Sequence, residues 1–217
     1  MEAMRITKAE RDKLNQASAE DVGYSFLTAL PATLAGNLGA LYTQNPALLS
    51  VAPTVIGINT GGAALGLIAK DPSKKELKEW DKSSALSFIP GVGPYRAAQR
   101  DKLQMENKKH RTANLLGERI GSLLFPAAMS VAGALIANKL TENSDARRKI
   151  VGIGMGSTLG ALLGSVPNMV GAALANANKR TKAQQIKHDD SKNLSNFLIP
   201  GKGYYNATQR LYAANNK

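Results

Sequence analysis

The stretch from Val22 to Ala69, VGYSFLTALPATLAGNLGALYTQNPALLSVAPTVIGINTGGAALGLIA, runs for 48 residues without Asp, Glu, Lys or Arg. A helix needs about 20 predominantly apolar residues to cross a bilayer, so the stretch is long enough for two crossings and a turn. The sequence Thr43-Gln44-Asn45-Pro46 marks the turn, because proline and its polar neighbours favour chain reversal. We therefore expect membrane-spanning helices near residues 24–42 and 47–69.

Two further stretches without charged residues follow in the second half of the chain. They cover residues 120–138 and 150–178 and are 19 and 29 residues long. They predict helices near 118–138 and 150–178 with a polar tip from Lys139 to Lys149 between them. The expected fold is all-α, with two tandem-repeated transmembrane hairpins, four spanning helices in total, and interfacial amphipathic helices. Core helices of a soluble protein are the alternative interpretation.

A short motif recurs after each hairpin. Residues 88–100 read FIPGVGPYRAAQR and residues 197–210 read FLIPGKGYYNATQR. Between Ile89 and Arg100, eight of twelve positions are identical to those 110 residues later, which indicates a duplicated unit. Proline cannot continue a helix and glycine permits a turn, so we expect each copy to turn the chain along the membrane surface. A loop between soluble helices is the alternative. The central motif residues are Ile89, Pro90, Gly91, Gly93 and Tyr95 in the first copy and Ile199, Pro200, Gly201, Gly203 and Tyr205 in the second.

The repeat gives the domain organisation. A polar N-terminal helix is expected before two repeats, and each repeat consists of a hairpin followed by a basic amphipathic segment. The expected boundaries are 1–21 for the N-terminal helix, 22–111 for repeat 1 (hairpin 22–69, basic segment 70–111) and 112–217 for repeat 2 (hairpin 118–178, basic segment 179–217).

Charge is distributed unevenly along the chain, which carries a net charge of +12. If four helices cross a membrane, 24 of the 28 Lys and Arg residues lie on one side, as the positive-inside rule requires of the cytoplasmic or interior side. Apolar residues at helical spacing among the lysines predict helices that lie on an anionic membrane surface. The residues expected to contact that surface are Lys74, Lys75, Lys78, Lys82, Lys108, Lys109, Arg111, Lys179, Arg180, Lys182 and Lys187.

Aromatic and small residues fit the same interpretation. Tyrosines flank the first helix, and single aromatic residues lie beside the basic segments, as expected at a membrane interface. Glycines repeat every four residues and predict close helix packing inside the bilayer, where apolar side chains provide no driving force for association. The interface residues are Tyr24, Tyr42, Trp80, Phe88 and Phe197, and the packing residues are Gly62, Gly66, Gly152, Gly156, Gly160 and Gly164.

The sequence contains no recognisable arrangement for catalysis. There is no cysteine, and neither His110 nor His188 has a second histidine or a carboxylate pair at metal-ligand spacing. We therefore expect no enzymatic activity, no cofactor and no metal site.

The expected function is that of a structural integral membrane protein, such as a virion component that links a bilayer to a coat or genome through its basic segments. The alternative is a bacteriophage-type internal, ejection or pore-forming protein whose glycine-rich helices insert into a membrane. Expected partners are anionic lipids and other proteins of a larger assembly. Non-specific nucleic-acid binding and homo-oligomer formation are both compatible with the sequence.

Overall fold

The computed structural model describes residues 8–105, 110–189 and 195–215, and every element in these ranges is a helix. The chain divides into two compact units, one formed by residues 1–34 and 51–108 and the other by residues 35–50 and 109–217. The first helix, α1 (Lys8–Thr43), begins in the first unit and ends in the second.

α1 is longer than the sequence predicts. The polar N-terminal segment and the first predicted span form one continuous helix of 36 residues rather than two elements. No glycine–proline break separates them, and Pro31 lies inside the helix. The predicted turn follows: α1 ends at Thr43, Gln44 adopts a positive φ of 53°, and the 3₁₀ helix η1 (Pro46–Ser50) begins.

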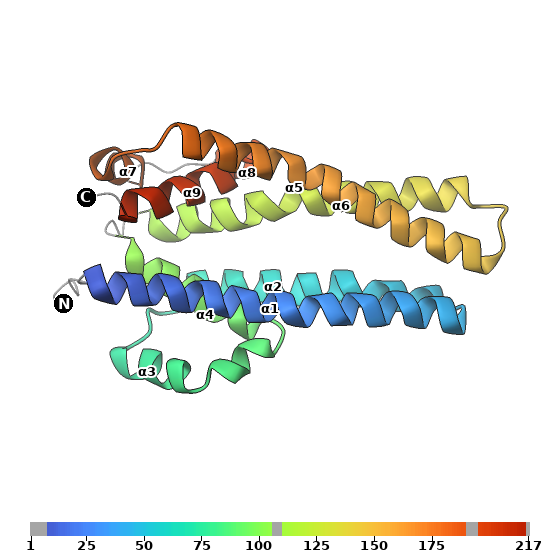
Figure 1. The fold of residues 1–217 in the computed structure, drawn as a ribbon, viewed down its shortest axis with the longest axis horizontal. Helices are drawn as coiled ribbons and strands as arrows, with labels where there is room; N and C mark the ends of the chain where they lie inside the picture. Colours follow the sequence, from blue (N-terminus) through green and yellow to red (C-terminus); the bar gives the residue numbers. More distant parts are fainter. Residues whose placement is uncertain (1–7, 106–109, 190–194, 216–217) are drawn as a thin grey trace. The chain divides into compact units, whose positions relative to one another are not determined.

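The first unit places a short helix against the second apolar helix. η1 leads into α2 (Val51–Ile68), and α4 (Val92–Gln104) packs against the part of α2 that ends at Ile68 (Figure 1). Between them lie α3 (Lys74–Lys82) and the 3₁₀ helix η2 (Ser84–Phe88). The predicted amphipathic segment is therefore broken in two.

Local hydrogen bonds explain the bounds of α3. The Ser73 hydroxyl accepts from the Glu76 N–H at 3.2 Å, and the Glu76 carboxylate accepts from the Ser73 N–H at 2.6 Å. This capping box fixes the start of the helix. At the other end the Ser83 hydroxyl donates to the Glu79 carbonyl at 2.7 Å, and the chain changes to 3₁₀ geometry.

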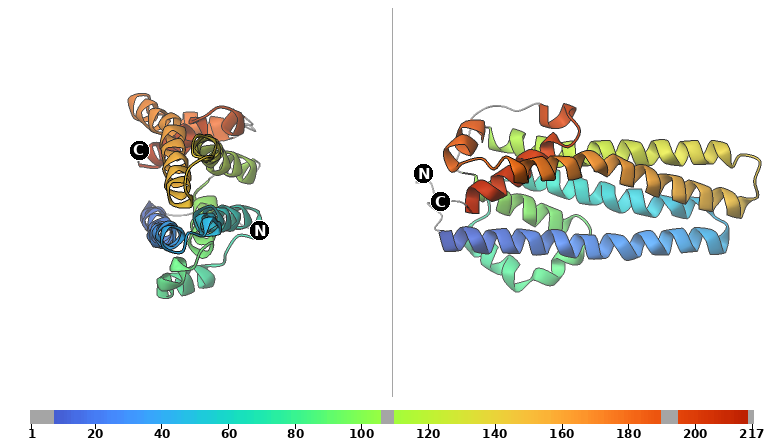
Figure 2. Two further views of the ribbon diagram at one scale, coloured as in Figure 1. Left: turned by 90° about the vertical axis from the view of Figure 1, so that its right-hand side faces the viewer. Right: turned by 45° about the horizontal axis from the view of Figure 1, so that its top comes forward.

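The second unit contains the longest helix pair. α5 (Arg111–Leu140) and α6 (Ala146–Ala177) run antiparallel, and α9 (Lys202–Asn215) packs against both near the end opposite their connecting turn (Figures 1 and 2). α7 (Lys182–Asp189) and α8 (Ser195–Leu198) complete the unit. Asp145 caps α6 through the Arg148 N–H at 2.9 Å, so both helices extend into the predicted tip at 139–149 and shorten it.

Three helical segments are long and apolar enough to cross a membrane: Pro46–Ile68, Arg111–Leu140 and Ala146–Ala177. The fourth predicted span, residues 24–42 of α1, is not among them. Its charge-free part carries Asn37, Pro31 and two threonines before the turn, and these lower its mean hydropathy.

Large apolar side chains lie mostly on the outside of this fold. Leu135 and Leu163 are 63% and 61% exposed, and many further aliphatic residues of α5 and α6 are exposed as well. The fully buried side chains are instead largely polar. Gln99, Gln209, Asn114 and Glu118 are all at most 2% exposed.

Candidate functional site

The two motif copies form turns of the same geometry. Gly91 and Gly201 have φ angles of 86° and 79°, a left-handed conformation that glycine adopts without a steric penalty. The Val92 N–H donates to the Ile89 carbonyl at 3.0 Å, and the Lys202 N–H donates to the Ile199 carbonyl at 3.1 Å. α4 and α9 begin directly after these glycines, at Val92 and Lys202.

Both turns lie directly against a long apolar helix, α2 in the first unit and α6 in the second. A Cβ atom on Gly62 would overlap the Gly91 carbonyl, and one on Gly66 would overlap the Tyr95 carbonyl. In the second unit a Cβ on Gly171 would overlap the Gly201 carbonyl. Gly62 and Gly66 therefore allow α4 to approach α2, which identifies α4 as the partner that the sequence did not specify.

The glutamine of each motif binds a carbonyl at the end of α6 or just beyond the end of α2. Gln99 Nε2 donates to the Lys70 carbonyl at 3.0 Å, just beyond the end of α2. Gln209 Nε2 donates to the Ala175 carbonyl at 3.1 Å and also to the Asn178 carbonyl, at the end of α6. The last carbonyls of a helix have no partner within the helix, so these side chains satisfy groups that burial would otherwise leave unpaired.

The arginine of each motif pairs with an acid of a long helix, α1 in the first unit and α5 in the second. In the first unit Arg100 Nε donates to Asp21 of α1 at 3.0 Å, and Nη2 donates to Asp81 of α3 at 3.0 Å. We call this arrangement the first arginine clamp.

The second arginine clamp has the same plan. Arg210 donates to both carboxylate oxygens of Glu118 in α5, at 2.5 and 2.7 Å, and to Asp189 of α7 at 3.2 Å. In both clamps the arginine thus joins a long helix, α1 or α5, to the helix that precedes the motif, α3 or α7.

Both clamps are largely buried, and the attraction between their charged groups is stronger there than it would be in water. The side chains of Arg100 and Asp21 are each 4% exposed, and that of Glu118 is 2% exposed. Burial lowers the pKa of Arg210, but the nearby Glu118 and Asp189 carboxylates outweigh it and hold the pKa above its ordinary value. Burial likewise raises the pKa of Asp189, yet its bonds to His188 and Arg210 leave the pKa below normal. Both groups are therefore charged at neutral pH.

Polar neighbours differ between the two clamps. In the first, the Ser87 hydroxyl donates to Asp21 at 2.6 Å and accepts from Arg96, whose pKa is lowered chiefly by burial. In the second, Asn206 occupies the position that corresponds to Arg96 and donates to Asn196 at 2.6 Å. The first clamp therefore contains one more permanent cation.

The predicted interface aromatics have different surroundings. Tyr42, beside the turn, is 91% exposed. The ring of Tyr24 lies 4.6 Å from that of Phe88, and Phe197 lies against Gly117 of α5. Trp80 packs on α4: the Arg96 and Arg100 guanidinium groups lie 5.7 and 5.9 Å from its ring centre, and the Tyr95 ring lies 6.2 Å away in a T-shaped arrangement. Trp80 thus packs within the protein, in addition to any contact it makes with a membrane surface.

The predicted surface-contact residues fall into three groups. Exposed lysines lie on α3 and around α7, Arg111 and Arg180 are half-buried, and Lys108, Lys109 and the side chain of Lys182 lie outside the described residues. Arg180 lies 5.3 Å from the Tyr205 ring and donates its N–H to Gln209 at 2.7 Å, so it belongs to the folded motif. The exposed lysines are Lys74, Lys75, Lys78, Lys82, Lys179 and Lys187.

The glycine row of α6 faces α5. Cβ atoms on Gly156 and Gly160 would overlap the carbonyls of Gly133 and Met129, and one on Gly164 would lie 2.6 Å from the Pro126 Cα. Gly152 lies instead against the Thr141 side chain, with its Cβ position 2.7 Å from Cγ2. Between these contacts the Ser130 and Ser157 hydroxyls share a hydrogen bond of 2.7 Å.

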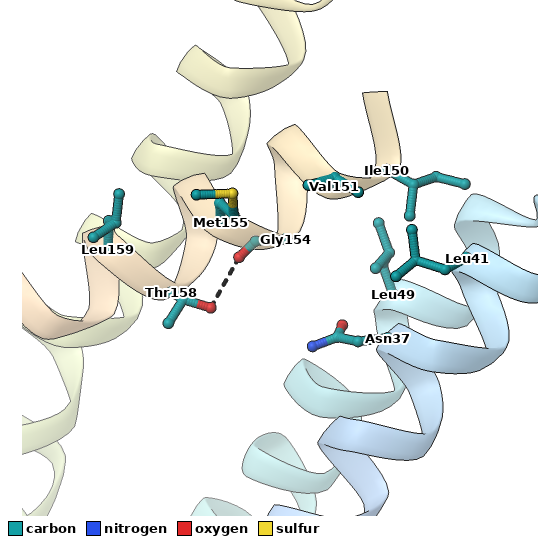
Figure 3. A pocket seen from close by; sticks show the side chains of 9 residues that line it. All are labelled: Asn37, Leu41, Leu49, Ile150, Val151, Gly154, Met155, Thr158 and Leu159. Carbon is teal, nitrogen blue, oxygen red and sulfur yellow. Dashed lines mark hydrogen bonds between the residues drawn. The ribbon is translucent and has the colours of Figure 1, made fainter. Parts of the chain in front are cut away.

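A mainly apolar hollow lies elsewhere in the second unit, between residues 37–49 and the first turns of α6 (Figure 3). Its polar side chains are Asn37 and Thr158, and the Thr158 hydroxyl donates to the Gly154 carbonyl of its own helix at 2.9 Å. The hollow therefore presents little chemistry for a polar ligand or a reaction.

The clamps were not identified as sites from the sequence, although a signal for them exists. Asp21 and Glu118 are the last acidic residues before the first two charge-free stretches, and Gln-Arg ends both motif copies. An acid at the edge of an apolar stretch needs a cation once it is buried, and a duplicated arginine supplies one.

Within the described residues no group of three or more His, Asp or Glu side chains could hold a metal ion. No protein-family model, curated protein sequence or solved structure matches the chain.

Proposed function

We propose that the chain is a non-enzymatic structural protein of a membrane, in which two helical hairpins span the bilayer. Each hairpin is closed at one end by its motif helix, and the basic segments beside the motifs face an anionic surface. In this proposal α1 supplies the fourth span and is joined to α2 by the turn that follows Thr43.

The distribution of burial is the observation that supports this proposal. Polar side chains such as Gln99, Gln209 and Asn114 are buried, whereas leucines such as Leu135 and Leu163 are exposed. In water, each exposed leucine forgoes about 1–2 kcal/mol of burial free energy. In a bilayer the exposed leucines contact acyl chains, and buried, paired polar groups are required because lipid offers them no hydrogen bonds.

The clamps agree with this placement. They lie where the chain enters the first apolar helix and leaves the second, which in a spanning hairpin is the level of the lipid head groups. A buried carboxylate at that depth is costly unless it is paired, and Asp21 and Glu118 are each paired with an arginine. The clamps thus complete the hairpin ends.

The exposed lysines beside the clamps suggest the role. Lys74, Lys75 and Lys78 point away from the protein on α3 and are suited to bind anionic lipid or an acidic protein or nucleic-acid layer, such as the coat or genome of a virion. We propose that the protein ties a bilayer to such a layer.

Alkaline carbonate extraction of native membranes tests this proposal. The protein is expected in the membrane pellet, because burial of three or four apolar helices does not depend on charge. A protein released into the supernatant would be peripheral, and the proposed spanning role would be wrong. In membranes sedimented at neutral pH without carbonate, a Lys74→Glu/Lys75→Glu/Lys78→Glu variant should remain in the pellet but lose the partner layer that sediments with the unmodified protein, whereas retention of that layer would reject the linking role.

A further inference from the structure

We propose that the first unit binds the head group of a phosphatidylethanolamine molecule in a polar hollow beside the first arginine clamp. The hollow has a volume of about 230 Å³ and lies between α1, α3, the start of η2 and α4. The inference rests on the proposed membrane function, which sets the hollow at head-group depth.

The position of the hollow fits a lipid head group. Its α1 side extends from Lys13 to Tyr24 and so crosses the boundary at Asp21, where the charge-free stretch begins. Next to Tyr24 lies Phe88, whose ring centre is 4.6 Å from that of Tyr24 and whose side chain is 43% exposed. Leu27, one turn further along α1, is 56% exposed. Polar groups therefore line one end and apolar surface continues from the other, as a phospholipid requires.

Two cations at the hollow are suited to a phosphate. Lys13 is exposed at the rim. Arg100 is 3% exposed, and its Nε and Nη2 bind Asp21 and Asp81. Within the part of the chain that the structure describes, Arg100 Nη1 donates no hydrogen bond, so this group is available to a phosphate oxygen.

The carboxylates at the hollow select the rest of the head group. Glu20, Asp21 and Asp81 line it, so three anions face two cations, and the net charge disfavours an anionic lipid. A primary ammonium can donate to Glu20 and to Asp81, whose side chain is 60% exposed. Choline cannot donate hydrogen bonds, and the Trp80 ring that could receive it is already contacted by two arginines. Ethanolamine is therefore the better fit.

The chain provides a direct probe, because Trp80 is its only tryptophan and lines the hollow. We would titrate the full-length protein in neutral detergent micelles with dihexanoyl phosphatidylethanolamine and follow Trp80 emission. The phosphatidylcholine and phosphatidylglycerol analogues are titrated in parallel. A saturable change is expected with the ethanolamine lipid at several-fold lower concentration than with the other two.

Two exposed carboxylates form a matched pair for the test. Glu20→Gln should weaken ethanolamine-lipid binding about tenfold, the size of one lost charge-assisted hydrogen bond. Glu79→Gln, on α3 but outside the hollow, should leave binding unchanged. Three results would overturn the proposal: equal lipid affinities of the two variants, no saturable change in Trp80 emission, or binding of the phosphatidylcholine or phosphatidylglycerol analogue at least as tight as that of the ethanolamine lipid. The titration needs no bilayer, so it is independent of the carbonate extraction. A protein that carbonate releases from the membrane but that still binds the ethanolamine lipid saturably would reject the spanning role and leave the lipid site standing.

Discussion

At the scale of single residues, Arg210 of the second unit is a largely buried cation that pairs with two carboxylates. Its guanidinium pairs with Glu118, whose side chain is 2% exposed, and with Asp189. A buried ion pair contributes little net stability compared with apolar side chains of the same size, but loss of one partner leaves an uncompensated charge. The clamp should therefore respond very differently to single and double substitutions.

Arg210→Ala is predicted to lower the free energy of unfolding by about 3–5 kcal/mol, because the Glu118 carboxylate stays buried without its partner. Arg210→Met combined with Glu118→Met should recover most of that loss. Unfolding by SDS in mixed micelles measures both. A double variant that is as unstable as the single one would show that the pairing of Arg210 with Glu118 is not what matters at this position.

The motif glycines give a second prediction. Gly201→Ala should destabilise the second unit by at least about 1–2 kcal/mol, because φ is 79° and the new Cβ would overlap the Pro167 carbonyl. Gly154→Ala is the control, since a Cβ at Gly154 meets nothing within 4 Å. Comparable stabilities of the two variants in the same SDS titration would mean that the turn does not require glycine.

At the scale of elements, the α5–α6 pair depends on backbone approach along one face of α6. The absence of cysteine from the chain permits a simple distance assay. Cysteines at positions 130 and 157, whose serine hydroxyls lie 2.7 Å apart, should form a disulfide on mild oxidation.

Gly156→Leu with Gly160→Leu should abolish this cross-link, because the leucine side chains would occupy the space of the α5 backbone. Gly154 is on the same helix, and a Cβ added there would meet no other atom within 4 Å, so Gly154→Leu should leave the cross-link intact. Equal cross-linking in both variants would show that the glycine row does not hold α5 and α6 together.

The sequence predicts these elements to different degrees. Charge-free stretches and the turn at Thr43–Pro46 locate the helices, because a bilayer-spanning segment excludes charge over a fixed length. The continuation of α1 through Asp21 and the break at Ser83 were missed. In the folded chain Asp21 is buried inside α1 and paired with Arg100, and the break at Ser83 coincides with a local serine hydrogen bond and with packing of η2 against α4. Helical periodicity reports none of these contacts.

The candidate site was predicted in part for a similar reason. Pro90-Gly91 and Pro200-Gly201 indicate turns, because few residues adopt a positive φ. The partners of those turns, α2 and α6, lie 20 or more residues away in sequence and are known only once the chain is folded. Trp80 illustrates the consequence: its helical spacing suggests an outward apolar face, whereas its ring packs against α4.

At the scale of the whole molecule, the two motif copies make corresponding contacts, each within its own unit. A glycine of α2 or α6 allows the motif turn to approach that helix, the motif glutamine binds a carbonyl at or just beyond the end of the same helix, and the motif arginine pairs with an acid of α1 or α5. Large apolar side chains of these helices are exposed, and the buried contacts of the motifs are largely polar. The central claim is that both hairpins span a membrane with both motifs on the same side.

Labelling of single cysteines in sealed membranes with an impermeant maleimide tests this claim most directly. The sites are Lys75→Cys and Lys187→Cys beside the two motifs, and Gln44→Cys and Ser144→Cys at the two hairpin tips. The account predicts that the first two react from one side and the last two only from the other. Labelling of Lys75→Cys and Lys187→Cys from opposite sides, or of either tip from the motif side, would contradict it.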